Sequence, residues 1–326
     1  MKAVVLTEYG GPEVLRFADI ADPQPGPEEV LVQVHSTALN RADLLQRMGL
    51  YRGPASRYEI PGLEYAGEVV SCGELVTSRS VGDRVMGILG GGCYAEFVVA
   101  HERTTSLIPD SITMSDAAAI PEAFLTAFDA LVLQGGLERN DWALVHAGAS
   151  GVGTAAIQVC GVVGARVAVT ASAPKLAACN ELGAAVCIDY TSQDFAAVLQ
   201  AEVPEGIAVV LDVVGGDALS KNLTVLAEGG RILQVGFMAG MTTQISLGQL
   251  LTKRAHLIGT TLRLRPIEEK ISLARSFNKT LLPLFETGQL RPVIDSRFPF
   301  SELGDAHEYL ASNQSVGKVV IEILPA

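Results

Sequence analysis

A glycine-rich segment stands between an apolar run that ends at His146 and a helix-like stretch that begins at Thr154. The segment consists of Gly148, Ala149, Ser150, Gly151, Val152 and Gly153. Glycines between a strand and a helix let backbone N–H groups and the positive helix N-terminus approach a pyrophosphate. In the G-x-G-x-x-G register, Ser150 replaces the middle glycine. Glycine clusters often only turn a chain, but the strand–turn–helix–strand setting favours a dinucleotide-binding site.

The residues that follow the second strand of this unit indicate which dinucleotide is bound. An NAD-preferring site usually places an acidic residue there for the ribose 2′-hydroxyl. Here the strand end runs from Thr170 to Ser172 and Lys175, with no acid before Glu181. Ser172 can donate a hydrogen bond to a 2′-phosphate and Lys175 can supply a cation, so we expect NADPH. The alternative is that Ser172 is the N-cap before Pro174 and Lys175 a solvated surface charge.

The elements around the turn alternate between strands and helices. Apolar runs occupy residues 143–146, 166–171, 187–190, 207–214, 231–237 and 256–262. Stretches with helical character occupy residues 152–163, 174–182, 193–201 and 217–226. This alternation predicts a parallel, doubly wound sheet, and six strands fit the dinucleotide-binding Rossmann layout.

The sequence on either side of this unit differs from it in composition and in hydrophobic pattern. The first 120 or so residues are dense in Gly and Pro, alternate in polarity at 30–35, and predict strands at 65–71, 84–89 and 95–100 with one helix at 41–48. After Arg265 an amphipathic helix is expected, whose regular part is kinked or ended by Pro283 and which stops at Gly288. Its inward face is expected to contain Ile267, Ile271, Ala274, Phe277, Leu281 and Leu284. A last strand at 317–324 returns to β texture, so residues 1–121 and 265–326 are expected to form one barrel-like domain, with residues 122–264 inserted in it.

Composition limits the possible partners. The chain has 326 residues, 48% of them hydrophobic and 18% charged, and its net charge is −12. It is apolar enough for a large core, and its acidity opposes broad nucleic-acid or anionic-membrane contacts. Residues 142–171 carry one charge, Arg166, but glycines divide this span, which favours a buried βαβ unit over a membrane helix. The five cysteines are scattered and no signal peptide is apparent, so we expect reduced thiols and a cytoplasmic protein.

Five segments together carry a family resemblance. They are LNRADLLQRMGLY (39–51), PGLEYAGEV (61–69), VGDRV (81–85), HAGASGVGTAAIQ (146–158) and VGKVVIEI (316–323). They resemble the zinc-independent quinone oxidoreductases of the medium-chain dehydrogenase/reductase superfamily, in particular the zeta-crystallin-like branch. The resemblance spans essentially the whole chain. It implies a GroES-like barrel with an inserted Rossmann domain, NADPH as cofactor, and a homodimer or a dimer of dimers.

The same resemblance argues against a metal. Zinc alcohol dehydrogenases of the superfamily carry Gly-His-Glu where this chain has Gly62, Leu63 and Glu64, together with cysteine ligands that this chain lacks. Leucine cannot coordinate a metal, so the Lewis acid that would polarise an alcohol oxygen is not expected. Hydride transfer to an acceptor that is already electrophilic, such as a quinone, is therefore favoured.

For the substrate side, the resemblance implies Asn40, Asp43 and Tyr51 as residues around a cleft between the domains. An Asn amide or a Tyr hydroxyl can hydrogen-bond a quinone oxygen. Asn40 is equally well placed as N-cap of the helix at 41–48, with Asp43 at the third helical position. Tyr51 has no such local role and is the better candidate for substrate contact, although it can also serve as a packing residue on the barrel rim.

The resemblance also implies further cofactor contacts, dispersed along the chain. They are Thr126, Tyr190, Gly236, Phe237, Met238, Leu262, Arg263, Leu264, Ser315 and Lys318. For Tyr190, a buried aromatic at a strand end is a close alternative. The five histidines form no spaced cluster, and each is expected to be a packing or surface residue.

Together these features predict an NADPH-dependent quinone reductase without metal that acts at the cleft between barrel and Rossmann domain. A second hypothesis is an enone or enoyl-thioester reductase, in which Tyr51 supplies the proton at Cα. A third is an NADPH-binding protein with a structural or RNA-associated role and little turnover. The net charge of −12 argues against RNA as the main partner.

Overall fold

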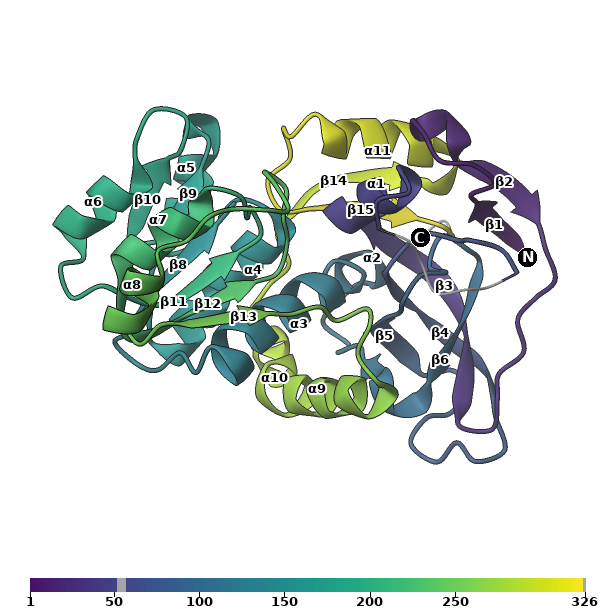
Figure 1. Cartoon of the computed structure of the whole chain (residues 1–326). Coiled ribbons are helices and arrows are strands. Elements are labelled where there is room, and N and C mark those ends of the chain that lie inside the picture. Colours follow the sequence, from purple (N-terminus) through teal and green to yellow (C-terminus); the bar gives the residue numbers. More distant parts are fainter. Residues whose placement is uncertain (52–56, 325–326) are drawn as a thin grey trace. The chain divides into compact units, whose positions relative to one another are not determined.

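The computed structural model describes residues 1–51 and 57–324 (Figure 1). The chain divides into two compact units. The first unit contains Met1–Leu125 and Arg263–Ala326, and the second unit is Thr126–Leu262. The boundaries expected from the sequence, after 121 and before 265, lie within a few residues of this division. The second unit is thus an insertion within the first.

The second unit is built on a parallel six-stranded sheet. Its strands in chain order are β8 (Trp142–His146), β9 (Arg166–Ala171), β10 (Val186–Asp189), β11 (Ile207–Asp212), β12 (Leu226–Gln234) and β13 (His256–Gly259). Their spatial order is β10-β9-β8-β11-β12-β13. The chain therefore runs outward from β8 in one direction and then resumes beside it at β11. This is the predicted doubly wound order, and its switch point lies between β8 and β11.

Helices connect these strands. They are α4 (Gly151–Val163), α5 (Leu176–Glu181), α6 (Phe195–Glu202), α7 (Ala218–Val225) and α8 (Leu247–Thr252). All five residues of β8 are buried, as expected of a parallel strand inside a covered sheet. Leu144 of β8 packs in one apolar cluster with Leu199 of α6 and Leu223 of α7. The glycine-rich turn is thereby attached to a strand that cannot move independently of the core.

The first unit is mainly β. Its seven-stranded sheet contains β3 (Glu29–Leu39), β4 (Glu64–Cys72), β5 (Arg84–Ile88), β6 (Phe97–His101), β7 (Ser106–Leu107), β14 (Ile294–Pro299) and β15 (Lys318–Glu322). A separate pair joins β1 (Lys2–Val5) to β2 (Arg16–Asp19). The C-terminal strand β15 pairs antiparallel with β3. The C-terminal strand thus lies in the same sheet as the N-terminal strand β3.

The first unit also contains helices, which precede, separate or follow these strands along the sequence. They are α1 (Arg41–Arg47), α2 (Met114–Ala117), α3 (Pro121–Phe128, which runs into the second unit), α9 (Ile267–Thr280), α10 (Leu282–Glu286) and α11 (Leu303–Ala311). The break between α9 and α10 precedes Pro283, as predicted, and Gly288 takes a positive φ of 72°. The prediction that Ile267 faces inward is wrong, because 46% of this side chain is exposed at the N-terminus of α9. The buried face begins at Ile271.

Candidate functional site

The glycine-rich turn of the second unit joins β8 to α4 through very close backbone packing. A Cβ added to Gly153 would lie 2.3 Å from the carbonyl oxygen of Ala147, and one added to Gly148 would lie 2.5 Å from Cβ of Val169. Only glycine fits at either position. Ser150 is the N-cap of α4, and its Oγ accepts the N–H of Gly153 at 3.0 Å. The serine in the middle position of the motif therefore caps the helix that follows.

This turn has the features of an anion-binding site. The first N–H groups of a helix have no carbonyl partner within the helix, and they carry the positive end of the helix dipole. In α4 the capping serine uses the N–H of Gly153, while Gly151 and Val152 form the start of the helix and are half-buried. Ala149 is buried. Because the turn follows β8 at the switch point of the sheet, these residues fit the pyrophosphate of a dinucleotide.

The end of β9 carries the residues that were predicted to select NADPH. Ser172 occupies the N-cap position of a short 3-10 helix, Ala173–Lys175, but makes no side-chain cap bond. The capping alternative for its hydroxyl is therefore weakened. Tyr190 follows β10, and its N–H bonds the carbonyl oxygen of Ala171 at 3.2 Å. Because 52% of Tyr190 is exposed, it is not a buried strand-end aromatic.

One acidic residue near this strand end was missed by the sequence reasoning. The carboxylate of Asp189, the last residue of β10, accepts hydrogen bonds from the hydroxyls of Ser192 and Thr191 and from the Thr191 N–H, at 2.7 to 3.0 Å. These bonds hold the pKa of Asp189 below its usual value. The Asp189 carboxylate thus forms its hydrogen bonds with residues of its own loop. Its position after the third strand, and not the second, is why the usual motif did not identify it.

The remaining predicted contacts of the second unit lie on several segments. Gly236 follows β12, and a Cβ there would lie 2.8 Å from the carbonyl oxygen of Val213. Phe237 and Met238 are 39% and 49% exposed. Thr126 and Leu262, at the two ends of the unit, are buried. Gly236 is thus required by close packing beside the segment after β11, and its neighbours present apolar side chains to solvent.

The first unit contains a buried charged cluster that includes two of the predicted site residues. Lys318 of β15 pairs with Glu64 of β4 at 2.6 Å, and both side chains are buried. The Lys318 Nζ also donates to Asn40 Oδ1 at 2.6 Å and to the carbonyl oxygen of Leu39 at 2.9 Å. The Asn40 amide in turn donates to Glu64 Oε1 at 2.8 Å. These contacts engage all three N–H groups of the ammonium within the first unit, so cofactor binding by Lys318 stays a prediction.

Asn40 and Asp43 also form the start of α1. The carboxylate of Asp43 accepts the backbone N–H of Asn40 at 2.7 Å, which is the geometry of a capping box. Asn40 is therefore fixed from two sides, by α1 and by the Glu64–Lys318 pair. Both residues have clear structural roles, and their contact with substrate stays a prediction.

Two carboxyl groups beside this cluster have altered acidity. Burial raises the pKa of Asp43 to about 6, although the Asn40 N–H and the Lys318 charge oppose the shift. Burial and the neighbouring charge of Glu64 raise the pKa of Glu122 to about 8. The N–H of Glu122 donates to Glu64 Oε2 at 2.8 Å. Sequence reasoning did not select Glu64 or Glu122, although an acid at the start of an apolar strand and another after Pro121 were the available signals.

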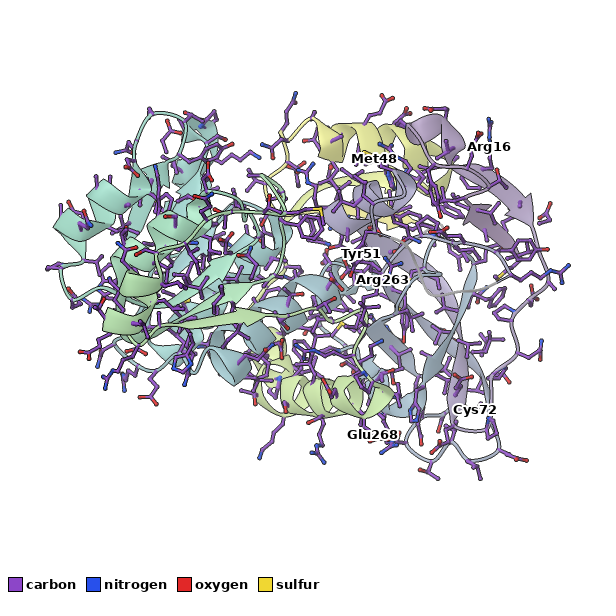
Figure 2. The ribbon with its side chains drawn as sticks, viewed as in Figure 1. Arg16, Met48, Tyr51, Cys72, Arg263 and Glu268 are labelled. Carbon is purple, nitrogen blue, oxygen red and sulfur yellow. The ribbon has the colours of Figure 1, made fainter. Side chains whose placement is uncertain are left out.

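Tyr51 is held by Arg263 (Figure 2). The guanidinium carbon lies 4.5 Å from the centre of the Tyr51 ring, and Nη1 donates to the Tyr51 carbonyl oxygen at 3.0 Å. Nη2 donates to Gln46 Oε1 at 2.8 Å and Nε to the Gly90 carbonyl oxygen at 2.6 Å. Arg263 is only 9% exposed. Its predicted contact with the cofactor stays a prediction, and the structure shows that Arg263 holds Tyr51, the residue predicted to contact substrate.

The other predicted residues of the C-terminal part diverge in exposure. Leu264 is 78% exposed, and Ser315 is buried. Leu63, the residue in the place of a zinc-binding histidine, is buried in the first unit.

Over residues 1–51 and 57–324, no group of three or more His, Cys, Asp or Glu side chains is arranged to hold a metal ion. In the same described part of the chain, every helix is too short or too polar to cross a membrane.

Comparison with known sequence families agrees with this architecture. Residues 26–110 match the alcohol dehydrogenase GroES-like domain, and residues 182–321 match the zinc-binding dehydrogenase family. The human synaptic vesicle membrane protein VAT-1 homolog is 32% identical over 98% of this chain and 86% of its own length. Human quinone oxidoreductase is 31% identical over 98% of this chain and 97% of its own length.

Solved structures give the same result. The quinone oxidoreductase of Escherichia coli in complex with NADPH superposes with a TM-score of 0.88 at 26% identity, covering 99% of this chain and all of that one. The CurK enoyl reductase superposes with a TM-score of 0.88 at 27% identity, covering 99% of both chains. Fold and turn geometry thus define a dinucleotide-binding oxidoreductase with a GroES-like domain. The chain belongs to the medium-chain dehydrogenase/reductase superfamily, in its zeta-crystallin-like quinone oxidoreductase branch.

Proposed function

We propose that this protein is an NADPH-dependent quinone oxidoreductase that works without a metal ion. The observation that carries the proposal is the glycine-rich turn at the switch point, followed by Ser172 and Lys175 where an NAD site has an acid. Human and bacterial relatives that are named quinone oxidoreductase support the acceptor class. Leu63 supports metal-free chemistry, because it offers no ligand where zinc-dependent relatives have a histidine.

When bound, NADPH supplies a hydride. The chain contributes the amides at the start of α4 for the pyrophosphate, and Ser172 with Lys175 for the 2′-phosphate. On the substrate side, the Tyr51 hydroxyl donates a hydrogen bond to one quinone oxygen. Arg263 fixes the Tyr51 ring and its backbone, which keeps this donor in one orientation. Orientation of this kind lowers the barrier because the entropy of alignment is lost before the reaction.

Reduction of an activated alkene is the second candidate. The similarity to the CurK enoyl reductase is as high as that to the NADPH-bound quinone oxidoreductase. In this reaction Tyr51 would protonate Cα after hydride arrives at Cβ. The two candidates use the same cofactor residues and differ in the acceptor and in the role of Tyr51.

One assay separates the candidates. NADPH oxidation is followed with a panel of ortho-quinones and with a panel of 2-enals and enoyl-CoA esters, and NADPH binding is measured in parallel by nicotinamide fluorescence. We expect turnover with quinones. Turnover with enones alone would overturn the quinone proposal in favour of the second candidate. Tight NADPH binding without any turnover would instead support a binding protein with a structural role.

We also propose that the protein forms a homodimer through the edge of the Rossmann sheet. The edge strand β13 exposes Leu257, and the neighbouring helix α8 exposes Leu247 and Leu251 at 67% and 75%. An edge strand with unpaired backbone groups and apolar neighbours favours pairing with a second copy. Sedimentation equilibrium is expected to give a dimer, and Leu257→Lys is expected to give monomers. A wild-type monomer at micromolar concentration would contradict this proposal.

A cytoplasmic location is part of the same proposal. All five cysteines are unpaired, and Cys93, Cys160 and Cys179 are buried. Unpaired thiols persist in reducing compartments. Cell fractionation is expected to recover the protein with cytosolic markers, and recovery with vesicle membranes would contradict the proposal.

A further inference from the structure

Four buried polar side chains form a continuous hydrogen-bonded chain across the second unit. Thr170 Oγ1 lies 2.9 Å from His146 Nδ1, and His146 Nε2 lies 2.8 Å from Asn222 Oδ1. Asn222 Nδ2 donates to Asp212 Oδ2 at 2.8 Å. Each of the four residues is at most 3% exposed. Buried polar groups without partners are costly, so this chain is a strict geometric constraint.

The direction of each hydrogen bond can be assigned starting from Asp212. The Asn222 amide nitrogen donates to Asp212 Oδ2, so the Asn222 amide oxygen faces His146 and accepts from it. His146 therefore donates from Nε2 and accepts at Nδ1 from the Thr170 hydroxyl. This assignment requires a neutral imidazole, which agrees with the pKa of His146 being lowered by burial. The ring edge also packs against Phe195 at 4.9 Å between centroids, which fixes its plane.

Both ends of this chain reach backbone turns at the carboxyl edge of the sheet. At one end, the Thr170 carbonyl oxygen accepts the N–H of Gly148 at 2.9 Å. His146 itself precedes Ala147, which has a positive φ of 54°, a conformation that L-residues disfavour.

At the other end, Asp212 Oδ1 accepts the N–H groups of Val214 and Gly215 at 2.7 and 2.8 Å. The hydrogen-bonded chain of four side chains thus joins the glycine-rich turn after β8 to the turn after β11. These two turns flank the switch point of the sheet, where dinucleotides bind.

We propose that His146 and Asn222 are positioning residues for the nicotinamide dinucleotide, which hold the two turns at the spacing that the cofactor requires. This inference rests on the proposed function, because it assumes that the glycine-rich turn binds the cofactor. Neither residue contacts the cofactor in this proposal. They act through the backbone of Ala147, Gly148 and the Val214–Gly215 turn. In this proposal the histidine at the end of β8, which the sequence predicted to be a packing or surface residue, also has a positioning role.

The test compares cofactor affinity with fold stability in the full-length protein. Asn222→Leu and His146→Leu, singly and together, each interrupt the chain at a buried site. Dissociation constants for NADPH and NADH are measured by fluorescence well below the unfolding temperature of each variant, and kcat and KM are measured with a saturating acceptor. We expect each single variant to raise the NADPH dissociation constant and KM about tenfold and to leave kcat within about twofold.

The matched control is Leu199→Ala, a core substitution in α6 of the same unit, in an apolar cluster that contains none of the four hydrogen-bonded residues. We expect it to lower the unfolding temperature and to change cofactor affinity less than twofold. The double variant is expected to bind about as weakly as the weaker single variant, because one break already uncouples the turns.

The outcomes separate the two proposals. Wild-type affinity in the variants, or an equal loss in Leu199→Ala, would overturn the positioning role while leaving cofactor binding intact. A wild-type protein that binds neither NADPH nor NADH would overturn both proposals.

Discussion

At the scale of single residues, Lys175 gives the most direct test of cofactor choice. A cation beside the 2′-phosphate contributes to NADPH binding and has no equivalent partner in NADH. We expect Lys175→Ala to raise KM for NADPH about tenfold, or about 1.4 kcal/mol, and to change KM for NADH less than twofold. Steady-state kinetics with both cofactors measures this. Lys221→Ala, which removes a surface lysine paired with Asp194, is the control. Equal effects on both cofactors would show that Lys175 is only a surface charge.

Tyr51 and Arg263 form the second residue-scale test. If the Tyr51 hydroxyl contacts the acceptor, Tyr51→Phe lowers kcat/KM for the quinone about tenfold without changing the NADPH dissociation constant. Arg263→Lys keeps the charge but loses the planar stacking and the forked donors, so it is expected to reduce kcat/KM by a similar factor.

Tyr309→Phe provides a control for this pair, because it removes a tyrosine hydroxyl that donates to Asp295 Oδ2 at 2.7 Å, at an exposed position. We expect it to retain wild-type kinetics. Unchanged quinone kinetics in Tyr51→Phe would remove Tyr51 from the substrate site and leave it as a packing residue.

Glu122 is expected to make stability depend on pH. Its pKa is raised from 4.5 to about 8, so the folded state prefers the protonated form. The unfolded state releases this proton near pH 4.5, and stability is therefore lost as pH rises from about 4.5 towards 8. Solvent at this partly exposed carboxyl limits the effect to roughly 2 kcal/mol.

Glu122→Gln cannot ionise, so we expect it to be more stable than the wild type at pH 8 and equal to it at pH 4.5. Urea unfolding at the two pH values measures the difference. Glu202→Gln, on the exposed end of α6, controls for the change in net charge. A Glu122→Gln variant that is destabilised equally at both pH values would contradict the shifted pKa.

At the scale of elements, two of the three glycines of α4 have opposite expected behaviour. A Cβ at Gly153 would overlap the backbone of Ala147 and Gly148, whereas a Cβ at Gly161 meets nothing within 4 Å. We expect Gly153→Ala to destabilise the protein by roughly 2 kcal/mol or more and to abolish NADPH binding. Gly161→Ala should stabilise it by about 0.5 to 1 kcal/mol through helix propensity and leave binding unchanged. Thermal unfolding and fluorescence titration of both variants measure this, and equal effects would contradict the packing argument.

The predictability of each element follows from how local its determinants are. The turn from Gly148 to Gly153 and the alternation around it were predictable, because strand, turn and helix signals lie within a few residues of one another. The parallel, doubly wound class of the sheet followed from the same alternation, whereas the spatial order of its strands is seen only in the structure. The Glu64–Lys318 pair was not predictable, because its partners are 254 residues apart and meet only when β15 pairs with β3. Sequence reasoning also missed α11, although its buried positions, Leu303, Ala306, His307 and Leu310, follow the i, i+3, i+4, i+7 spacing of a helix.

The residues of the candidate site likewise divide into those with local determinants, which the sequence predicts, and those with long-range contacts, which it does not. Asn40 could be predicted both as a cap and as a site residue, and the structure adds a third role in the buried ion cluster. The contact between Arg263 and Tyr51 joins residues 212 positions apart, so no local sequence pattern predicts it. The chain of Thr170, His146, Asn222 and Asp212 was hidden for a similar reason. It depends on which strands are neighbours and on which helix covers them.

At the scale of the whole molecule, the net charge of −12 and the buried ionisable groups decide how the protein responds to acid. Protonation of surface carboxylates below pH 5 lowers the net negative charge and reduces its repulsion. Buried neutral histidines act in the opposite direction, since unfolding lets them take up a proton. His307 of α11 is fully buried, with Nε2 3.1 Å from the Tyr94 hydroxyl, and burial with the nearby Arg47 charge lowers its pKa to about 3.

His307 is therefore expected to set the acid limit of stability. Its folded pKa lies below the unfolded value of 6.5, so the stability it contributes is present above pH 6.5 and is lost as pH falls from 6.5 towards 3. Between pH 6 and pH 4 this loss amounts to about 2 kcal/mol. His307→Gln can keep a hydrogen bond to Tyr94 but cannot take up a proton. We expect the variant to be less stable than the wild type at pH 7 and to lose less stability on acidification, as measured by urea unfolding from pH 7 to pH 4. An acid slope equal to that of the wild type would show that other groups, and not His307, determine the acid limit.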